Sequence, residues 1–174
     1  MTLPGLAVHA SRNTPSALYP ELERLFAQLL ELPIAIGSGW QSPAEKHLLK
    51  MATPFSRANL LIFIAKPFRA FTLPEHLTPL YRENRLVIIE PDVQQKRIDA
   101  RGVEIRDTIL DDLINHHLFC YIEPGEKLAR RLYQLSRRGK YLYLLDIPVH
   151  QDYIDAGGMF VDADHPEPLL DALQ

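Results

Sequence analysis

The chain alternates short, almost wholly apolar runs with amphipathic segments, and this alternation restricts its fold more than any other feature. The apolar runs have the length and composition of buried strands and cover residues 6–10, 34–36, 59–65, 86–89, 118–122 and 141–145. Segments with helical spacing of apolar residues separate them, and parallel strands require such crossover connections. We therefore predict an α/β fold of the Rossmann-like type, with a doubly wound, mainly parallel sheet of about six strands and a small edge strand near residues 159–161.

The size and composition of the chain are those of one globular domain spanning residues 1–174, and its hydrophobic content of 47% is enough for a sizeable core. The formal net charge of −3 gives no general attraction to nucleic acid or an anionic membrane, so any anion site has to be local. The single cysteine, Cys120, excludes an intramolecular disulfide and suits a reducing compartment. We expect a cytoplasmic protein with no membrane partner, because neither a signal peptide nor a membrane-spanning apolar run is evident.

One stretch, residues 33–49, joins an apolar run to a helix through two glycines. Ser42 is predicted as the N-cap of that helix, with Glu45 as the return partner of a capping box. A strand, a glycine turn and a helix N-terminus leave backbone N–H groups free and direct a positive dipole end outward, which favours a phosphate or a carboxylate. The predicted anion-binding residues of this turn are Gly37, Ser38, Gly39, Trp40 and Ser42.

The glycine turn does not by itself identify a ligand. It lacks the third glycine of a dinucleotide-binding fingerprint and the Gly-Lys-Ser sequence of a P-loop. A capped helix after a tight turn explains Ser42 and Glu45 without any ligand. Trp40 is expected either to stack on a base or to cover the helix against a neighbouring loop.

Polar residues follow several of the predicted strands, and ligands of doubly wound sheets bind at the carboxyl ends of the strands. Ser11 and Arg12 follow the first strand, and we expect both to contact the anion. Acidic residues follow the fourth, fifth and sixth strands and are candidates for acid–base chemistry: Glu90, Glu123 and Asp146. Solvation of loops is an alternative explanation for any one of these residues.

The basic residues fall into two groups with different expected roles. One group lies on a helix predicted over residues 125–138 and at its end, and much of it is expected to form a solvated face, since cations at a helix C-terminus complement the dipole. Arg106 is predicted to open a helix over residues 106–116, where a cation is less favourable, so it is the better candidate for a ligand contact; an ion pair with Asp107 is the alternative. His116 and His117 are expected to compensate the dipole at the end of that helix.

Other parts of the sequence offer little chemistry. The histidines show no metal-ligand spacing, and Cys120 lies in an apolar run, so we predict no metal site, no cofactor and no catalytic nucleophile. Residues 92–102 are charged and weakly patterned and are expected to form an exposed helix or loop.

Several motifs occur in the order found in one protein family. Ser11-Arg12 ends the first strand as in a Gly-Ser-Arg motif, with Ala10 for the glycine, and Ser38-Gly39 matches the start of a longer glycine motif. Residues 106–110 are similar to an Arg-Asn-Arg-Ile-Ile helix start, and residues 122–128 to a strand ending in Glu before a Gly-Ser-Leu helix start. The chain resembles the Rossmann-like domain of the DNA-processing protein A (DprA/Smf) family, within the nucleotide-sensing Rossmannoid proteins related to LOG-type phosphoribohydrolases.

This resemblance implies a non-catalytic protein that binds a nucleotide or single-stranded DNA, with a homodimer as the expected assembly. It adds Gly125 and Lys127 to the anion-binding residues. The LOG-type run Pro-Gly-Gly-x-Gly-Thr-x-x-Glu is absent, which argues against nucleosidase chemistry. Two alternatives stay open: an enzyme that acts on a small nucleotide-like substrate through the acidic residues at the strand ends, and a degenerate scaffold that works through protein contacts.

Overall fold

The computed structural model describes residues 4–92 and 99–174, in which seven strands form one sheet. The strands are β1 (Gly5–Ala10), β2 (Ala35–Ser38), β3 (Asn59–Phe63), β4 (Leu86–Ile89), β5 (His116–Tyr121), β6 (Tyr141–Leu145) and β7 (Met159–Val161). Their order is β4-β3-β2-β1-β5-β6-β7, and every neighbouring pair is parallel. The predicted doubly wound parallel sheet is confirmed, with β7 as the short edge strand.

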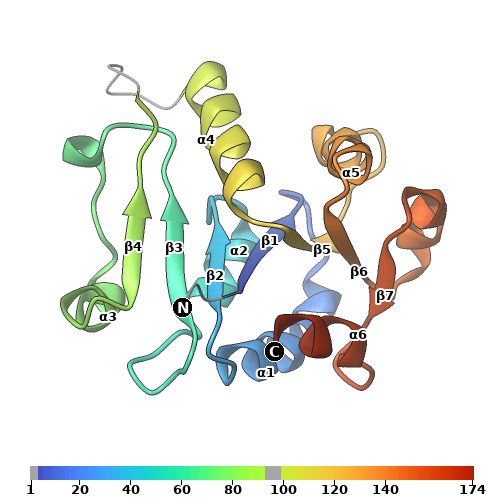
Figure 1. Ribbon diagram of the computed structural model, residues 1–174, viewed down its shortest axis with the longest axis horizontal. Helices are drawn as coiled ribbons and strands as arrows, with labels where there is room; N and C mark the ends of the chain where they lie inside the picture. The colour runs from blue at the N-terminus through green and yellow to red at the C-terminus, as the bar shows by residue number, and fades with distance from the viewer. Residues whose placement is uncertain (1–3, 93–98) are drawn as a thin grey trace.

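Helices lie along both faces of this sheet (Figure 1). The α-helices are α1 (Tyr19–Leu30), α2 (Pro43–Leu49), α3 (Thr78–Arg82), α4 (Ala100–Leu113), α5 (Lys127–Arg137) and α6 (Glu167–Leu170). Short 3-10 helices are η1 (Ser16–Leu18), η2 (Phe68–Ala70), η3 (Glu75–Leu77), η4 (Pro148–Ala156) and η5 (Asp171–Leu173).

Successive strand residues point to opposite faces of the sheet and so contribute to separate hydrophobic clusters on the two faces. Leu6 and Val8 of β1 belong to the larger core, which also contains buried residues of α1, α2, α3 and α6. Ala7, between them, packs on the other face with Leu110 of α4. Leu132 of α5 packs on buried residues of β5 and β6 in a third cluster. The helices α4 and α5 therefore cover the face opposite to α1 and α2.

The strand order reverses between β1 and β5, which are neighbours in the sheet although three other strands separate them in the chain. From β1 the chain adds β2, β3 and β4 on one side, and after α4 it adds β5, β6 and β7 on the other. Such a reversal leaves a crevice at the carboxyl ends of the two central strands, because their connections run in opposite directions.

Helix α4 differs from its prediction at both ends. It begins at Ala100 and ends at Leu113. Asp99 is its N-cap, and the Asp99 side chain accepts a hydrogen bond from the N–H of Gly102 at 2.7 Å. Arg106 is therefore in the middle of the helix and not at its start. The dipole role predicted for His116 and His117 is wrong, because both residues lie in β5, where they pair with β1. Of the segment predicted over 92–102, residues 93–98 lie outside the described residues.

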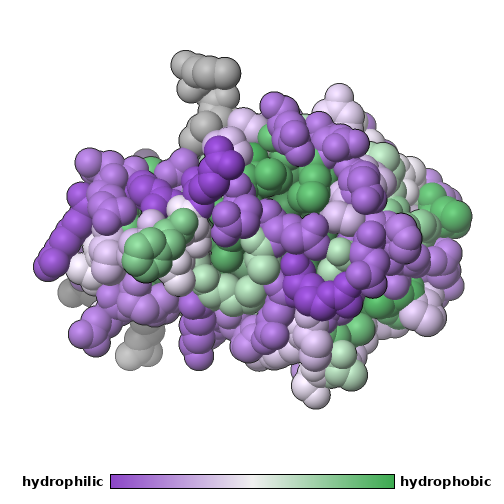
Figure 2. All heavy atoms as spheres, turned by 90° about the horizontal axis from the view of Figure 1, so that it is seen from below, coloured by the Kyte–Doolittle hydropathy of each residue, from purple (hydrophilic) through white to green (hydrophobic). Residues whose placement is uncertain are grey.

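Among the described residues, every helix is too short or too polar to cross a membrane. Figure 2 shows the end of the molecule from which β3 and β4 start, where a mainly hydrophilic surface is interrupted by separate hydrophobic areas. The crevice at the strand reversal lies at the opposite end of the strands.

Candidate functional site

A pocket of about 310 Å³ lies at the strand reversal, where the carboxyl end of β1 meets the N-terminal parts of α2 and α5 and the middle of α4. Most of its lining residues are of polar or charged types, and the full lining consists of His9, Ala10, Ser11, Arg12, Gln41, Ser42, Glu45, Arg106, Asp107, Glu126, Lys127, Leu128 and Arg131. Doubly wound folds bind their ligands at this position. We therefore take this pocket, called the switch-point pocket below, as the candidate functional site.

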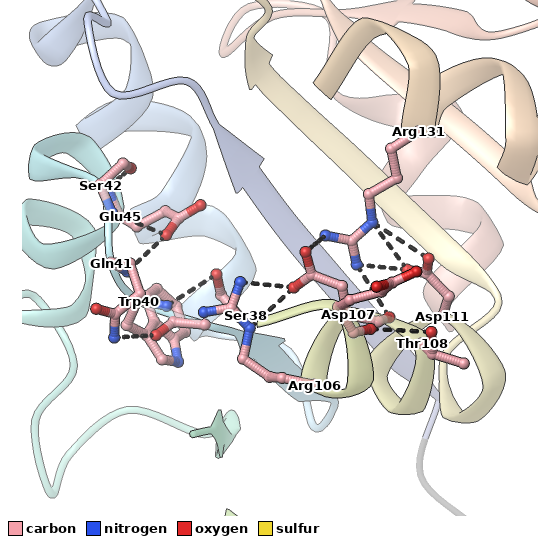
Figure 3. Close-up of polar contacts among 12 residues, drawn as sticks. Ser38, Trp40, Gln41, Ser42, Glu45, Arg106, Asp107, Thr108, Asp111 and Arg131 are labelled. Atoms are coloured by element: carbon pink, nitrogen blue, oxygen red, sulfur yellow. Dashed lines mark hydrogen bonds and ion pairs between the residues drawn. The ribbon is translucent and has the colours of Figure 1, made fainter. Parts of the chain in front are cut away.

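The N-terminus of α2 has the predicted capping box. The hydroxyl of Ser42 accepts a hydrogen bond from the N–H of Glu45 at 3.1 Å, and the Glu45 carboxylate accepts one from the N–H of Ser42 at 3.2 Å. The same carboxylate also accepts a hydrogen bond from the N–H group of Gln41 at 2.8 Å (Figure 3). It accepts another from the N–H group of Ala10 at 3.1 Å. Burial raises the pKa of Glu45, and these three N–H groups oppose the rise. The protein's own carboxylate thus occupies the donors predicted for an external anion.

The glycine turn before α2 serves packing at two of its positions. Gly37 lies within β2, where an added Cβ would be 2.9 Å from both Ile114 Cδ1 and Phe63 Cε2. Trp40 has a positive φ of 50° and is only 3% exposed, and its indole N–H donates to the carbonyl of Leu61 at 3.0 Å. Little of the ring is available for stacking on a base, so the burial of Trp40 agrees better with the alternative expectation that it covers the helix.

Three side chains form a charged bridge between α4 and α5. Asp107 accepts hydrogen bonds from Arg106 at 2.6 and 2.8 Å and forms an ion pair with Arg131 at 3.3 Å, so it lies between the two guanidinium groups (Figure 3). Arg131 also forms an ion pair with Asp111, whose pKa is raised by burial against the opposing effect of Arg131. The bridge positions two arginines at the pocket wall. It also partly neutralises them.

Arg12 and Lys127 supply further positive charge. Both line the pocket, Arg12 from the loop after β1 and Lys127 from the first residue of α5. Within residues 4–92 and 99–174, neither side chain forms an ion pair. Their charges are available to an incoming anion without displacement of a carboxylate.

The remaining predicted site residues lie outside the pocket lining or have structural partners. Ser11 lines the pocket, but its hydroxyl accepts from the N–H of Glu123 at 2.9 Å and so ties β1 to the end of β5. Glu123 itself accepts from the side chain of Asn13. Glu90 accepts from the N–H of Phe68, and Asp146 accepts from Gln151 at 3.3 Å. Those positions outside the lining are Gly37, Ser38, Gly39, Trp40, Gly125, Glu90, Glu123 and Asp146.

Sequence reasoning missed two prominent pocket residues. Arg131 was assigned to a solvated face, although it follows Lys127 by four residues and must share a helix face with it, a signal that could have identified it. His9 is a polar residue inside an otherwise apolar strand, and only its environment in the fold reveals that it reaches the pocket. Among the described residues, there is no group of three or more His, Cys, Asp or Glu side chains that could hold a metal ion.

The chain shares its fold with several solved structures at low sequence identity, although it matches no protein-family model and no curated protein. DprA from Streptococcus pneumoniae is 14% identical with a TM-score of 0.69, over 91% of this chain and 58% of that one. DprA from Helicobacter pylori, solved for its single-stranded DNA binding mode, is 13% identical with a TM-score of 0.73, over 99% and 83%. The molybdenum cofactor carrier protein from Chlamydomonas reinhardtii is 14% identical with a TM-score of 0.67, over 98% of both chains. This chain therefore spans just over half of the first structure and nearly all of the third.

Proposed function

We propose that this protein is a non-catalytic binding protein that holds the phosphate group of a nucleotide, or of single-stranded nucleic acid, in the switch-point pocket. The observation that supports this most directly is the convergence of Arg12, Arg106, Lys127 and Arg131 on one pocket at the strand reversal. Arg12 and Lys127 neutralise the phosphate, and the bridged arginines contribute hydrogen-bond donors. The α2 N-terminus does not take the anion, because Glu45 already uses its donors.

The dimensions of the pocket favour a small ligand. A volume of about 310 Å³ is at the lower end of the range for ligand sites, which is about 300–1,000 Å³. The molybdenum cofactor carrier protein shares the fold over nearly its whole length, so a cofactor carrier of this size and architecture has a precedent. A mononucleotide or a similar phosphorylated compound is therefore our first choice.

Single-stranded nucleic acid is the second candidate, and a specific groove supports it. A cavity of about 740 Å³ between α4 and α5 shares Asp107, Lys127 and Arg131 with the pocket. Its lining adds Arg130, Arg137 and Arg138, a row of charges suited to successive phosphates. The shared fold with the DprA structure solved for DNA binding is consistent with this use. Three carboxylates in the same groove, Glu104, Asp107 and Asp111, reduce its net charge.

The two other interpretations have less structural support. The carboxylates assigned to an enzyme, Glu90, Glu123 and Asp146, lie outside the pocket lining. If the protein released a base or phosphate from any nucleotide in a panel, this result would support the enzyme alternative. A melting temperature unchanged by every nucleotide and by single-stranded DNA would favour the scaffold alternative. A homodimer and a cytoplasmic location stay predictions.

A binding titration with a matched pair of variants tests the proposal. AMP, GMP and single-stranded oligothymidylates of increasing length are titrated at low salt into the wild type, Arg12→Ala and Arg57→Ala. Arg57 is also an exposed arginine, but it precedes β3 at the other end of the strands, so it controls for net charge. We expect Arg12→Ala alone to weaken binding about tenfold. Equal affinities in all three proteins would refute the pocket as the site.

The same titration separates the two ligand classes. If the ligand is a mononucleotide, the affinity per molecule does not rise with oligonucleotide length. If it is a nucleic acid, the affinity rises with length, and the salt dependence steepens by about 0.7 in log–log slope for each phosphate neutralised.

A further inference from the structure

His9 is a buried histidine held in a fixed orientation at the inner end of the switch-point pocket. It lies in β1 and is 4% exposed, and its ring stacks against the rings of His117 and Phe119 at centroid distances of 5.3 and 4.9 Å. The two stacking partners lie on the neighbouring strand β5. The ring therefore cannot turn freely, and the position of each of its nitrogens is determined by the sheet.

A chain of hydrogen bonds determines which nitrogen of His9 holds the proton. Nε2 of His117 lies 3.1 Å from the carbonyl oxygen of Ile114, and this oxygen can only accept, so Nε2 of His117 is protonated. Nδ1 of the neutral His117 is then an acceptor. Nε2 of His9 lies 3.0 Å from it and must donate. Nδ1 of His9 is consequently the unprotonated nitrogen.

The free nitrogen of His9 lies at the pocket surface. Among the described residues, Nδ1 has no hydrogen-bond partner, while every fully buried side-chain nitrogen or oxygen there has one. Nδ1 is therefore not fully buried, and the open space next to His9 is the switch-point pocket. Burial, and then the charges of Arg131, His117 and Arg106, hold the pKa of His9 well below its usual value, so the ring stays neutral.

We propose that His9 determines ligand specificity by accepting, at Nδ1, a hydrogen bond from a hydroxyl or N–H group of the ligand. This inference rests on the proposed function and names its ligand class: a phosphate ester that also has a hydrogen-bond donor close to the phosphate, as in a sugar phosphate or a nucleotide. A ligand without such a donor leaves the Nδ1 lone pair unpaired beside it, which costs affinity. A bare phosphate oxygen at this position meets a lone pair and is disfavoured.

The proton positions can be measured directly on the ligand-free protein. In protein labelled with ¹⁵N-histidine, we expect the ¹⁵N chemical shifts of His9 and His117 to show protonated Nε2 and unprotonated Nδ1 in both rings at pH 8. The spectrum of the His9→Asn variant identifies the His9 signals by their loss. A proton on Nδ1 of His9 would overturn the inference.

A pair of probes tests the specificity. Glycerol 3-phosphate has hydroxyls next to its phosphate, and propyl phosphate has the same charge and chain length without them. At pH 8, where neither ester retains a phosphate proton, we expect the wild type to bind glycerol 3-phosphate about fivefold more tightly. Equal affinity for the two probes would refute the role of His9 and leave the proposed function intact. Binding of neither probe would overturn the inference, while the titrations with AMP, GMP and oligothymidylates decide the proposed function separately.

Two variants of His9 test whether the preference for glycerol 3-phosphate depends on the acceptor atom Nδ1. His9→Asn places an amide oxygen near the position of Nδ1, whereas His9→Phe fills the same space without an acceptor. Both remove the donor to His117, so they control for each other's effect on stability, which thermal melting measures. We expect His9→Phe to lose the preference for glycerol 3-phosphate and His9→Asn to retain part of it. Retention of the full preference in His9→Phe would contradict the assignment.

Discussion

The guanidinium group of Arg106 lies directly against the backbone of Gly39, so that a Cβ added to Gly39 would be 2.6 Å from Nη1 and 2.7 Å from Cζ. Gly39 follows β2 and Arg106 belongs to α4, so two segments distant in the sequence meet at this contact. The absence of a side chain at Gly39 therefore makes room for an arginine of the pocket wall, although Gly39 itself does not line the pocket.

Gly39→Ala is expected to displace Arg106 and weaken phosphate binding about tenfold. Folding should change little, because the atoms in the way are at the end of a flexible side chain. The affinity for AMP and the melting temperature together check this. Gly5→Ala is the matched control, since its added Cβ would find its first neighbour at an ordinary 3.6 Å. An unchanged affinity in Gly39→Ala would show that Arg106 does not act in binding.

Gly37→Ala is expected to lower the stability of the protein and to leave its affinity for phosphate unchanged. Its Cβ would overlap Ile114 and Phe63 in a packed part of the sheet, so the free energy of unfolding should fall by about 1–3 kcal/mol. The affinity of the folded protein should not change. Urea unfolding measures the loss, and the double variant with Ile114→Val, which removes one of the two clashing atoms, should recover part of it. No recovery would argue against the contact as the cause.

Glu45→Ala is expected to destabilise the protein by about 2–4 kcal/mol, because three N–H groups, two of them buried, lose their acceptor. It also leaves these donors open to an external anion at the α2 N-terminus. Sulfate should therefore stabilise this variant more than it stabilises the wild type. Urea unfolding in sodium sulfate and sodium chloride gives the comparison, and equal sulfate effects in both proteins would count against the exchange of one anion for the other.

Asp107→Asn is expected to increase the affinity for a phosphate ligand several-fold. In the wild type the Asp107 carboxylate competes with the ligand phosphate for the guanidinium groups of Arg106 and Arg131. The amide of the variant competes less strongly. The gain should diminish in high salt, where charge interactions are screened. Asp112→Asn is the control, because Asp112 pairs with Arg138 outside the switch-point pocket. A decrease in affinity would indicate that Asp107 orients the arginines.

The stability of the protein should fall in mild acid because of its buried histidines. Burial lowers the pKa of His117 from 6.5 to about 3, so between these values the unfolded chain binds a proton that the folded chain does not. The free energy of unfolding then falls by about 1.4 kcal/mol per pH unit for this group as the pH drops below 6.5. His117→Gln, which retains a donor toward Ile114, should reduce the slope, whereas His76→Gln at an exposed site should not. Equal slopes would contradict the buried, neutral state of His117.

Local sequence signals were sufficient for most of the fold. The apolar run at 118–122 and its equivalents predicted the parallel sheet, because such runs are buried on both faces only when helices cover both. The capping box of Ser42 and Glu45 was also predictable, since both partners lie within one turn of helix. The start of α4 was not, because it depends on Asp99 in a segment without clear apolar periodicity.

The candidate site was predicted in part. Ser11, Arg12, Ser42, Arg106 and Lys127 do line the pocket, as residues at strand ends and helix starts often do. Arg106, however, reaches the pocket from the middle of α4 and not from a helix start. Arg131 belongs to the basic run predicted as a solvated face from the helix dipole, and the sequence of α5 does not show its carboxylate partners, which lie on α4.

The sequence by itself determined the alternation of strands and helices, the cap of α2 and the polar residues that follow the strands, since all of these depend on residues near one another in the chain. Only the tertiary structure decided that Glu45 takes the backbone donors, that Gly39 makes room for Arg106 and that His9 presents an unprotonated nitrogen to the pocket. Each of these depends on a partner that the sheet brings close, such as His117 on β5, and the order of strands in a sheet cannot be read from local periodicity.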